Sequence, residues 1–132
     1  MIPEIETKQP SEIKSYQESR LPELLNYLNN NSAFYREHFK NNNINIQSIT
    51  KLEDLQQIPV TTKDDLQLRN NDFFCVDKSK VVDFITTSGT IGEPVTFAMT
   101  NHDLDRLAYN EQISFSCADT TKQDQQSNTK QC

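Results

Sequence analysis

The stretch TTSGTIGEP, residues 86–94, contains both glycines of this 132-residue chain. Gly89 and Gly92 lie three positions apart in a run of hydroxyl-bearing residues that ends at Pro94. Glycine adopts positive φ without steric cost and has no Cβ, so successive backbone N–H groups of such a loop can converge on one anion. The stretch is therefore typical of two structures, a tight hairpin turn and a phosphate-binding loop.

The residues on both sides of this loop favour a hairpin followed by a helix. Residues 81–85 and 95–99 are rich in β-branched and aromatic side chains, which predicts two strands joined by the loop. Residues 100–103 resemble the start of a helix, and apolar residues continue at helical spacing as far as Phe115.

The first third of the chain has the apolar spacing of two helices. The first begins near Ser11, and the asparagine run at residues 29–31 ends it. Pro22 lies inside this pattern and predicts a kink or a break, because proline lacks the amide hydrogen that an inner helical turn needs. Ser32 is placed to cap the second, shorter helix.

Two capping boxes predict two more short helices before the hairpin. Thr50 and Glu53 have the spacing of the first box, and Pro59 ends the helix that it opens. Thr62 and Asp65 repeat the spacing and open the second helix.

Composition and charge exclude several classes of partner. The net charge is -6 and the pI is near 4.8, whereas nucleic acids and anionic membranes require a basic surface. No apolar stretch approaches the length that crosses a bilayer, and the first residues do not have the pattern of a signal peptide. Hydrophobic residues make up only 34% of the chain, which is low for a self-sufficient core.

The cysteines and histidines do not form a recognisable site. The three cysteines are widely spaced without a C-x-x-C motif, which favours a reducing cytoplasm over a disulfide framework. Only His38 and His102 could supply imidazole, and they are far apart, so we predict no metal site. We also predict no catalytic residue, since no Ser/His/Asp set, carboxylate pair or Cys–His pair is recognisable.

The glycine loop does not match the two commonest nucleotide-binding motifs. The Walker A sequence G-x-x-x-x-G-K-[ST] and the dinucleotide motif G-x-G-x-x-G are both absent. Instead, T-S-G-T-x-G-x-P between two strands resembles the phosphate-binding loop of the AMP-forming, adenylate-forming ligase superfamily. Three further stretches resemble the opening of phenylacetate–CoA ligases: NNSAFYREHF (30–39), SITKLEDLQQIPVTTKDDLQ (48–67) and TNHDLDRLAYNEQISF (100–115).

This resemblance, which runs from about residue 10 to residue 117, implies a fold and a division of the chain. The expected fold class is α/β, an incomplete acyl–CoA synthetase-like N-terminal domain. Residues 1–80 would form a helical N-terminal segment, and residues 81–117 a hairpin with the phosphate-binding loop plus a helix. Residues 118–132 are almost wholly polar and without periodicity, which predicts a disordered and aberrant tail.

The resemblance also implies a site and a reaction. Such ligases join a carboxylic acid to AMP, release pyrophosphate and transfer the acyl group to coenzyme A, with ATP and Mg²⁺ as cofactors. Two residues depart from the superfamily pattern: Ile91 replaces a small hydroxylated residue, and Glu93 places a negative charge beside a polyphosphate. The residues expected to contact the ATP phosphates, with Thr87 at the entry to the loop, are Thr87, Ser88, Gly89, Thr90, Ile91 and Gly92.

A ligase of this type is several times longer than 132 residues, so we expect the chain to be an N-terminal fragment that is inactive alone. The carboxylic acid cannot be deduced, because the residues that would form its pocket are not recognisable. Two alternatives stay open from the sequence: a non-catalytic module that binds a nucleotide, and a protein-interaction module. Unpartnered apolar faces would also allow self-association.

Overall fold

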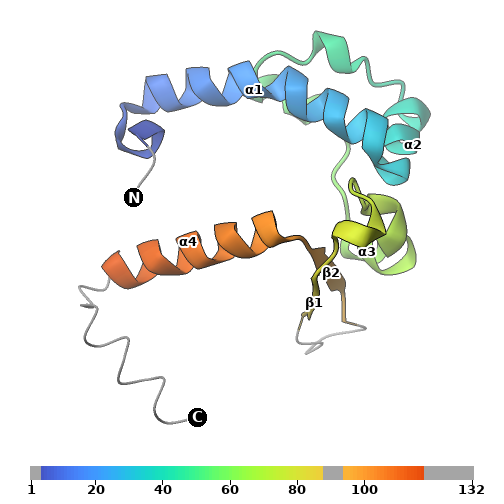
Figure 1. Ribbon diagram of the computed structural model, residues 1–132. Helices are drawn as coiled ribbons and strands as arrows, with labels where there is room; N and C mark the ends of the chain where they lie inside the picture. Colours follow the sequence, from blue (N-terminus) through green and yellow to red (C-terminus); the bar gives the residue numbers. More distant parts are fainter. Residues whose placement is uncertain (1–3, 88–93, 118–132) are drawn as a thin grey trace.

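The computed structural model describes residues 4–87 and 94–117, which form helices that precede and follow a single antiparallel hairpin (Figure 1). Within these residues the chain is mostly helical, and α4 follows the hairpin, as the sequence predicts. The elements in chain order are η1 (Glu4–Thr7), α1 (Pro10–Asn31), α2 (Ala33–Asn41), η2 (Ile46–Ser48), η3 (Leu52–Gln57), α3 (Lys63–Leu68), η4 (Asn70–Phe73), η5 (Lys78–Lys80), β1 (Asp83–Thr86), β2 (Thr96–Met99) and α4 (Asn101–Cys117), where η marks a 3₁₀ helix.

Helix α1 continues through Pro22, so of the two predicted outcomes, a kink or a break, the break is not formed. Pro22 itself is exposed, whereas Leu21 and Leu25 on the inner face of α1 are buried. Burial of these two side chains favours one continuous helix and offsets the backbone hydrogen bond that proline cannot make. The helix begins one residue earlier than predicted, at Pro10, and the Glu12 carboxylate accepts a hydrogen bond from the Gln9 N–H at 3.2 Å.

Ser32 separates α1 from α2 and caps the second helix, as predicted. Its Oγ accepts a hydrogen bond from the Tyr35 N–H at 3.2 Å and donates one to the Asp72 carbonyl at 2.8 Å. The residue has no exposed surface. One buried hydroxyl therefore holds the start of α2 and the η4 turn together.

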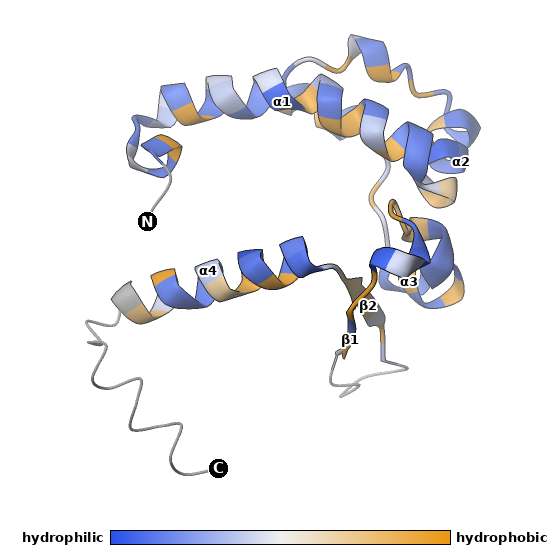
Figure 2. Ribbon diagram, viewed as in Figure 1, coloured by the Kyte–Doolittle hydropathy of each residue, from blue (hydrophilic) through white to orange (hydrophobic). Residues whose placement is uncertain are grey.

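The core lies where the second half of α1 meets α2 and the segment that follows it. Its buried side chains are Leu25, Phe39 and Ile49, with partly buried aliphatic and aromatic side chains packed around them. Figure 2 shows the apolar residues of α1 concentrated in the half of the helix beside α2. A second contact stacks the Phe34 ring on Phe73 with centroids 4.0 Å apart, which brings η4 against α2.

The two predicted capping boxes have different outcomes. Thr62 and Asp65 form theirs: Thr62 N–H and Oγ1 donate to the Asp65 carboxylate at 2.8 and 2.7 Å. The box predicted for Thr50 and Glu53 is wrong, because Asp54 accepts the hydrogen bonds from Thr50 N–H and Lys51 N–H at 3.0 and 2.9 Å. These two hydrogen bonds, of which the one from Thr50 has the larger effect, hold the pKa of Asp54 below its ordinary value.

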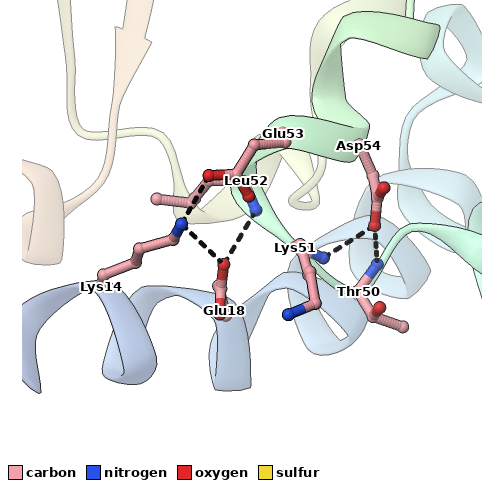
Figure 3. A network of polar contacts seen from close by, with 7 residues as sticks. All are labelled: Lys14, Glu18, Thr50, Lys51, Leu52, Glu53 and Asp54. Carbon is pink, nitrogen blue, oxygen red and sulfur yellow. Dashed lines mark hydrogen bonds and ion pairs between the residues drawn. The ribbon is translucent and has the colours of Figure 1, made fainter. Parts of the chain in front are cut away.

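Glu53 instead joins a polar network that fixes η3 against α1 (Figure 3). The Lys14 ammonium contacts the Glu53 carboxylate and lies 3.8 Å from Glu18. Glu18 also accepts a hydrogen bond from the Leu52 N–H at 3.3 Å. The contact with α1 explains why Glu53 is not available to cap η3.

The hairpin pairs Asp83 with Met99 at one end and Thr86 with Thr96 at the other. Its first strand begins two residues later than predicted, because Asp77 caps the short 3₁₀ helix η5, which ends at Lys80 and has Val81 as its C-cap. Helix α4 starts with the predicted signal: Thr100 N–H and Oγ1 donate to the Asp103 carboxylate at 2.9 and 2.7 Å. In the part of the chain that the structure describes, no helix is long and apolar enough to cross a membrane.

Candidate functional site

The described residues at the base of the loop close it with two hydrogen bonds. Thr87 N–H donates to the Val95 carbonyl at 2.9 Å, and Val95 N–H donates to Thr87 Oγ1 at 3.0 Å. One step further from the loop, the hydroxyls of Thr86 and Thr96 lie 3.3 Å apart. The two threonines that precede the glycines therefore bring the two ends of the loop together, whatever the loop itself binds.

A hydrogen bond connects this base to the helical segment, and one of its residues is buried. Val95, just before β2, is only 4% exposed. The Asn70 side chain donates to the Thr96 carbonyl at 2.8 Å and so connects η4 to the outer edge of β2. Sequence reasoning missed Asn70, because its contact is 26 residues away and its local sequence resembles any polar turn.

Of the predicted phosphate-binding residues, only Thr87 belongs to the part of the chain that the structure describes. Ser88, Gly89, Thr90, Ile91 and Gly92 lie outside the described residues, as does the predicted disordered tail, residues 118–132. Thr87 uses its N–H and one lone pair of its hydroxyl to close the loop. Its hydroxyl hydrogen remains able to donate to a ligand, since a hydroxyl has one donor and two acceptor positions.

Helix α4 begins one residue after β2 ends, so the loop base and the first turn of α4 share one segment. Two hydrogen bonds from Thr100, of which the one from its N–H has the larger effect, hold the pKa of Asp103 below its ordinary value of 3.8. The carboxylate is therefore charged near neutral pH, and its capping role is satisfied. His102 lies exposed in the same turn.

A hollow of about 370 Å³ separates the hairpin from the helical segment. Its wall includes Tyr27, Phe73 and Cys75 on one side and Phe97 on the other. Tyr27 Oη donates to the Cys75 carbonyl at 3.1 Å, and burial raises the pKa of the Cys75 thiol. A raised pKa reduces the thiolate fraction, so Cys75 lacks the activation that a nucleophilic cysteine requires.

Across residues 4–87 and 94–117, no group of three or more His, Cys, Asp or Glu side chains is arranged to hold a metal ion. Among the described residues, Thr87 and Val95 form a hydrogen-bonded base for a short glycine-containing loop.

Comparison with solved structures gives the class of protein to which this fold corresponds. A structure of 2-hydroxyisobutyryl-CoA ligase in complex with 2-HIB-AMP and CoA matches with a TM-score of 0.66 at 27% sequence identity. The match covers 74% of this chain and 22% of the ligase chain. An open conformation of the same ligase, also with 2-HIB-AMP and CoA, matches with a TM-score of 0.66 at 25% identity, over 74% of this chain and 24% of that one. The structure thus resembles part of an acyl-CoA ligase.

Sequence comparison gives the family. The phenylacetate-coenzyme A ligase of Thermus thermophilus is 33% identical over 103 residues, which cover 77% of this chain and 23% of the relative. The enzyme of the same name from Pseudomonas putida is 31% identical over 111 residues, covering 82% and 25%. Protein CapK of Staphylococcus aureus is 33% identical over 94 residues, covering 70% and 20%. This chain is a partial homologue of the phenylacetate–CoA ligases, which confirms the resemblance seen in the sequence.

The chain spans about a quarter of the length of the curated relatives that it matches. No protein-family model matches the sequence.

Proposed function

We propose that this chain is the N-terminal fragment of an ATP-dependent, AMP-forming aryl-acid–CoA ligase of the phenylacetate type. In this proposal residues 86–94 contribute to the site for the ATP phosphates, and the chain alone does not catalyse the ligase reaction. The full ligase would take ATP, Mg²⁺, a carboxylic acid and coenzyme A in the cytoplasm.

One observation carries the proposal: the match to the phenylacetate–CoA ligases includes the glycine loop. A continuous segment that covers 77% of a 132-residue chain contains residues 86–94 wherever it begins. The closed base formed by Thr87 and Val95 supports the same role. A loop with fixed ends can present its N–H groups to a phosphate at little cost in conformational entropy.

The chemistry of the loop residues suits stabilisation of a departing pyrophosphate. Backbone N–H groups near Gly89 and Gly92, with the hydroxyls of Ser88 and Thr90, would donate to oxygens whose charge increases as the bond to the α-phosphate breaks. Preorganised donors of this kind lower the barrier because they do not reorient during the reaction.

The experiment is a chimera in which this chain replaces the homologous segment of the Thermus thermophilus ligase. We expect ATP- and CoA-dependent thioester formation with phenylacetate. Changing Gly89→Val or Ser88→Ala should lower kcat/KM for ATP, by about a hundredfold for loss of a preorganised donor. Ser48→Ala is the matched control, because Ser48 is exposed and its hydroxyl contacts only the Asn45 carbonyl. An unchanged kcat/KM in the Gly89→Val chimera would refute the phosphate role.

The full-length 132-residue chain tests the second part of the proposal. Incubated with ATP, MgCl₂, phenylacetate and coenzyme A, it should release no pyrophosphate. Sustained release above the rate without enzyme would show that the chain is a complete catalyst.

A further inference from the structure

Asn70, the first residue of η4, links the helical segment to the base of the glycine loop. Its side-chain amide donates to the carbonyl of Thr96, the first residue of β2, at 2.8 Å. The residue before Thr96 is Val95, which forms two hydrogen bonds with Thr87 and so closes the loop. The residue that Asn70 binds is therefore adjacent to the closed base.

The geometry of the hairpin leaves the Thr96 carbonyl without a partner in β1. Thr87 N–H donates to the Val95 carbonyl, and hydrogen-bonded pairs alternate along an antiparallel ladder with pairs that exchange no backbone bond. Thr86 and Thr96 form the next pair along the ladder. The backbone groups of Thr96 therefore point away from β1, and the Asn70 amide supplies the donor that β1 does not.

The η4 turn that carries Asn70 is itself held on the helical segment. Ser32 Oγ donates to the Asp72 carbonyl in this turn at 2.8 Å. The residue before Asn70, Arg69, forms ion pairs of 2.8 Å with Glu37 in α2 and with Asp72. Asn70 therefore donates from a backbone that is fixed on both sides.

The hollow of about 370 Å³ between the hairpin and the helical segment adjoins this hydrogen bond, since both Asn70 and Thr96 line it. Phe97, the next residue of β2, also lines the hollow and is 43% exposed. An empty space supplies no partner atoms to the side chains around it. The position of β2 relative to η4 therefore depends on the Asn70 amide more than on packing.

We propose that Asn70 is a positioning residue for the ATP phosphate site, which it holds in place through Thr96 and the base formed by Thr87 and Val95. This inference rests on the proposed function. Donors to a departing pyrophosphate must be in place before the bond breaks, and a displacement of about 1 Å can cost about a hundredfold in rate. In this role Asn70 acts through the base of the loop and does not itself donate to ATP.

The experiment measures the two half-reactions of the chimera separately. The first converts ATP and phenylacetate to phenylacetyl-AMP and pyrophosphate. The second transfers the acyl group of added phenylacetyl-AMP to coenzyme A and releases AMP. Asn70→Asp keeps the size of the side chain but replaces the donating NH₂ with an acceptor. We expect kcat/KM for ATP in the first half-reaction to fall at least about tenfold, mainly through kcat, and the second half-reaction to stay within about twofold, because no pyrophosphate takes part in it.

Asn42→Asp is the matched control. The Asn42 amide also donates to a backbone carbonyl at 2.8 Å, that of His38, but this bond lies at the end of α2 and does not reach the hairpin. The control adds the same charge and should leave both half-reactions unchanged. Equal losses in both half-reactions of Asn70→Asp would show that Asn70 only stabilises the fold, and would overturn the proposal.

Hydrogen exchange of the 132-residue chain gives a second measurement, which needs neither ATP nor the rest of the ligase. The backbone amides of Thr87 and Val95 should exchange at least about fivefold faster in Asn70→Asp than in the parent chain, because the base loses its link to η4. Amides of residues 34–39 in α2 serve as the internal control. Unchanged exchange at Thr87 and Val95 would contradict the proposed role.

The Gly89→Val variant keeps this inference apart from the proposed function. If Gly89→Val slows the first half-reaction and Asn70→Asp does not, the phosphate role holds and the positioning role fails. If Gly89→Val leaves the first half-reaction unchanged, the phosphate role fails, and the role of Asn70 fails with it. If both variants slow this step, the double variant should lose less than the product of the two single losses, since both act on the geometry of one loop. A loss equal to that product would refute the link between Asn70 and the loop.

Discussion

Replacing Ser32 with alanine should destabilise the helical segment more than any other single hydroxyl deletion in α1 or α2. The side chain is fully buried and makes two hydrogen bonds to different elements. Ser32→Ala leaves the Tyr35 N–H without its cap and the Asp72 carbonyl without its donor. Water cannot replace the lost hydroxyl without repacking, because the residue has no exposed surface.

The magnitude follows from the two bonds. Loss of an N-cap serine costs about 1 kcal/mol, and loss of a second buried hydrogen bond costs about 1 kcal/mol more. We therefore expect the free energy of unfolding to fall by about 2 kcal/mol. For a chain of 132 residues, each kcal/mol lowers Tm by about 4 °C, so the shift should be about 8 °C.

Urea and thermal denaturation followed by circular dichroism would measure this loss. Ser19→Ala is the control, since Ser19 is exposed and its hydroxyl donates only to the Tyr16 carbonyl one turn earlier. Its effect should stay within about 0.5 kcal/mol. If Ser32→Ala and Ser19→Ala are equally stable, the argument from burial and shared capping is wrong.

Three further predictions test the site and the polar contacts around it. Thr87→Val removes the hydroxyl that accepts the hydrogen bond from the Val95 N–H, so hydrogen exchange of the Val95 amide should accelerate about fivefold or more. The control Thr86→Val should change this exchange rate little, and equal acceleration in both variants would contradict the role of Thr87. The pKa of Asp103 is lowered in the folded state, so the charged carboxylate contributes to stability above pH 3.8, and this contribution is lost as pH falls through the lowered pKa. The urea midpoint of Asp103→Asn should therefore fall less on acidification than that of the parent chain. Lys14→Met should lower Tm less than Ser32→Ala does, and its difference from the parent chain should disappear in about 1 M salt, where exposed ion pairs are screened. A loss of Tm that is independent of salt would show that the network in Figure 3 acts through packing.

The features that the sequence predicted correctly depend on residues within a few positions of each other. Ser32 caps α2, and Thr62 with Asp65 opens α3, because each capping hydrogen bond reaches only the next turn. The hairpin is also local, since its strands are separated only by the loop. The resemblance to the ligase family added what these local patterns could not supply, a chemical role for the loop.

The wrong or missed features depend on distant partners. Glu53 has the right spacing to cap a helix, yet Lys14, 39 residues earlier, contacts it and Asp54 becomes the cap. Asn70 reaches β2 across 26 residues, and Tyr109 Oη donates to Glu6 across 103 residues at 2.8 Å. At the site, the sequence placed Thr87 at the entry of the loop but gave no sign that its hydroxyl closes the base.

Only Thr100 separates β2 from α4, so a rotation at the base of the loop would be transmitted to the whole helix. With 17 residues, α4 is about 25 Å long, so a rotation of about 10° at its first turn would move its last turn by about 4 Å. The hydrogen bond between Tyr109 and Glu6 would restrain this movement near the middle of the helix. A rotation at the base of the glycine loop would therefore be amplified along α4, at a point far from any ligand that the loop would hold.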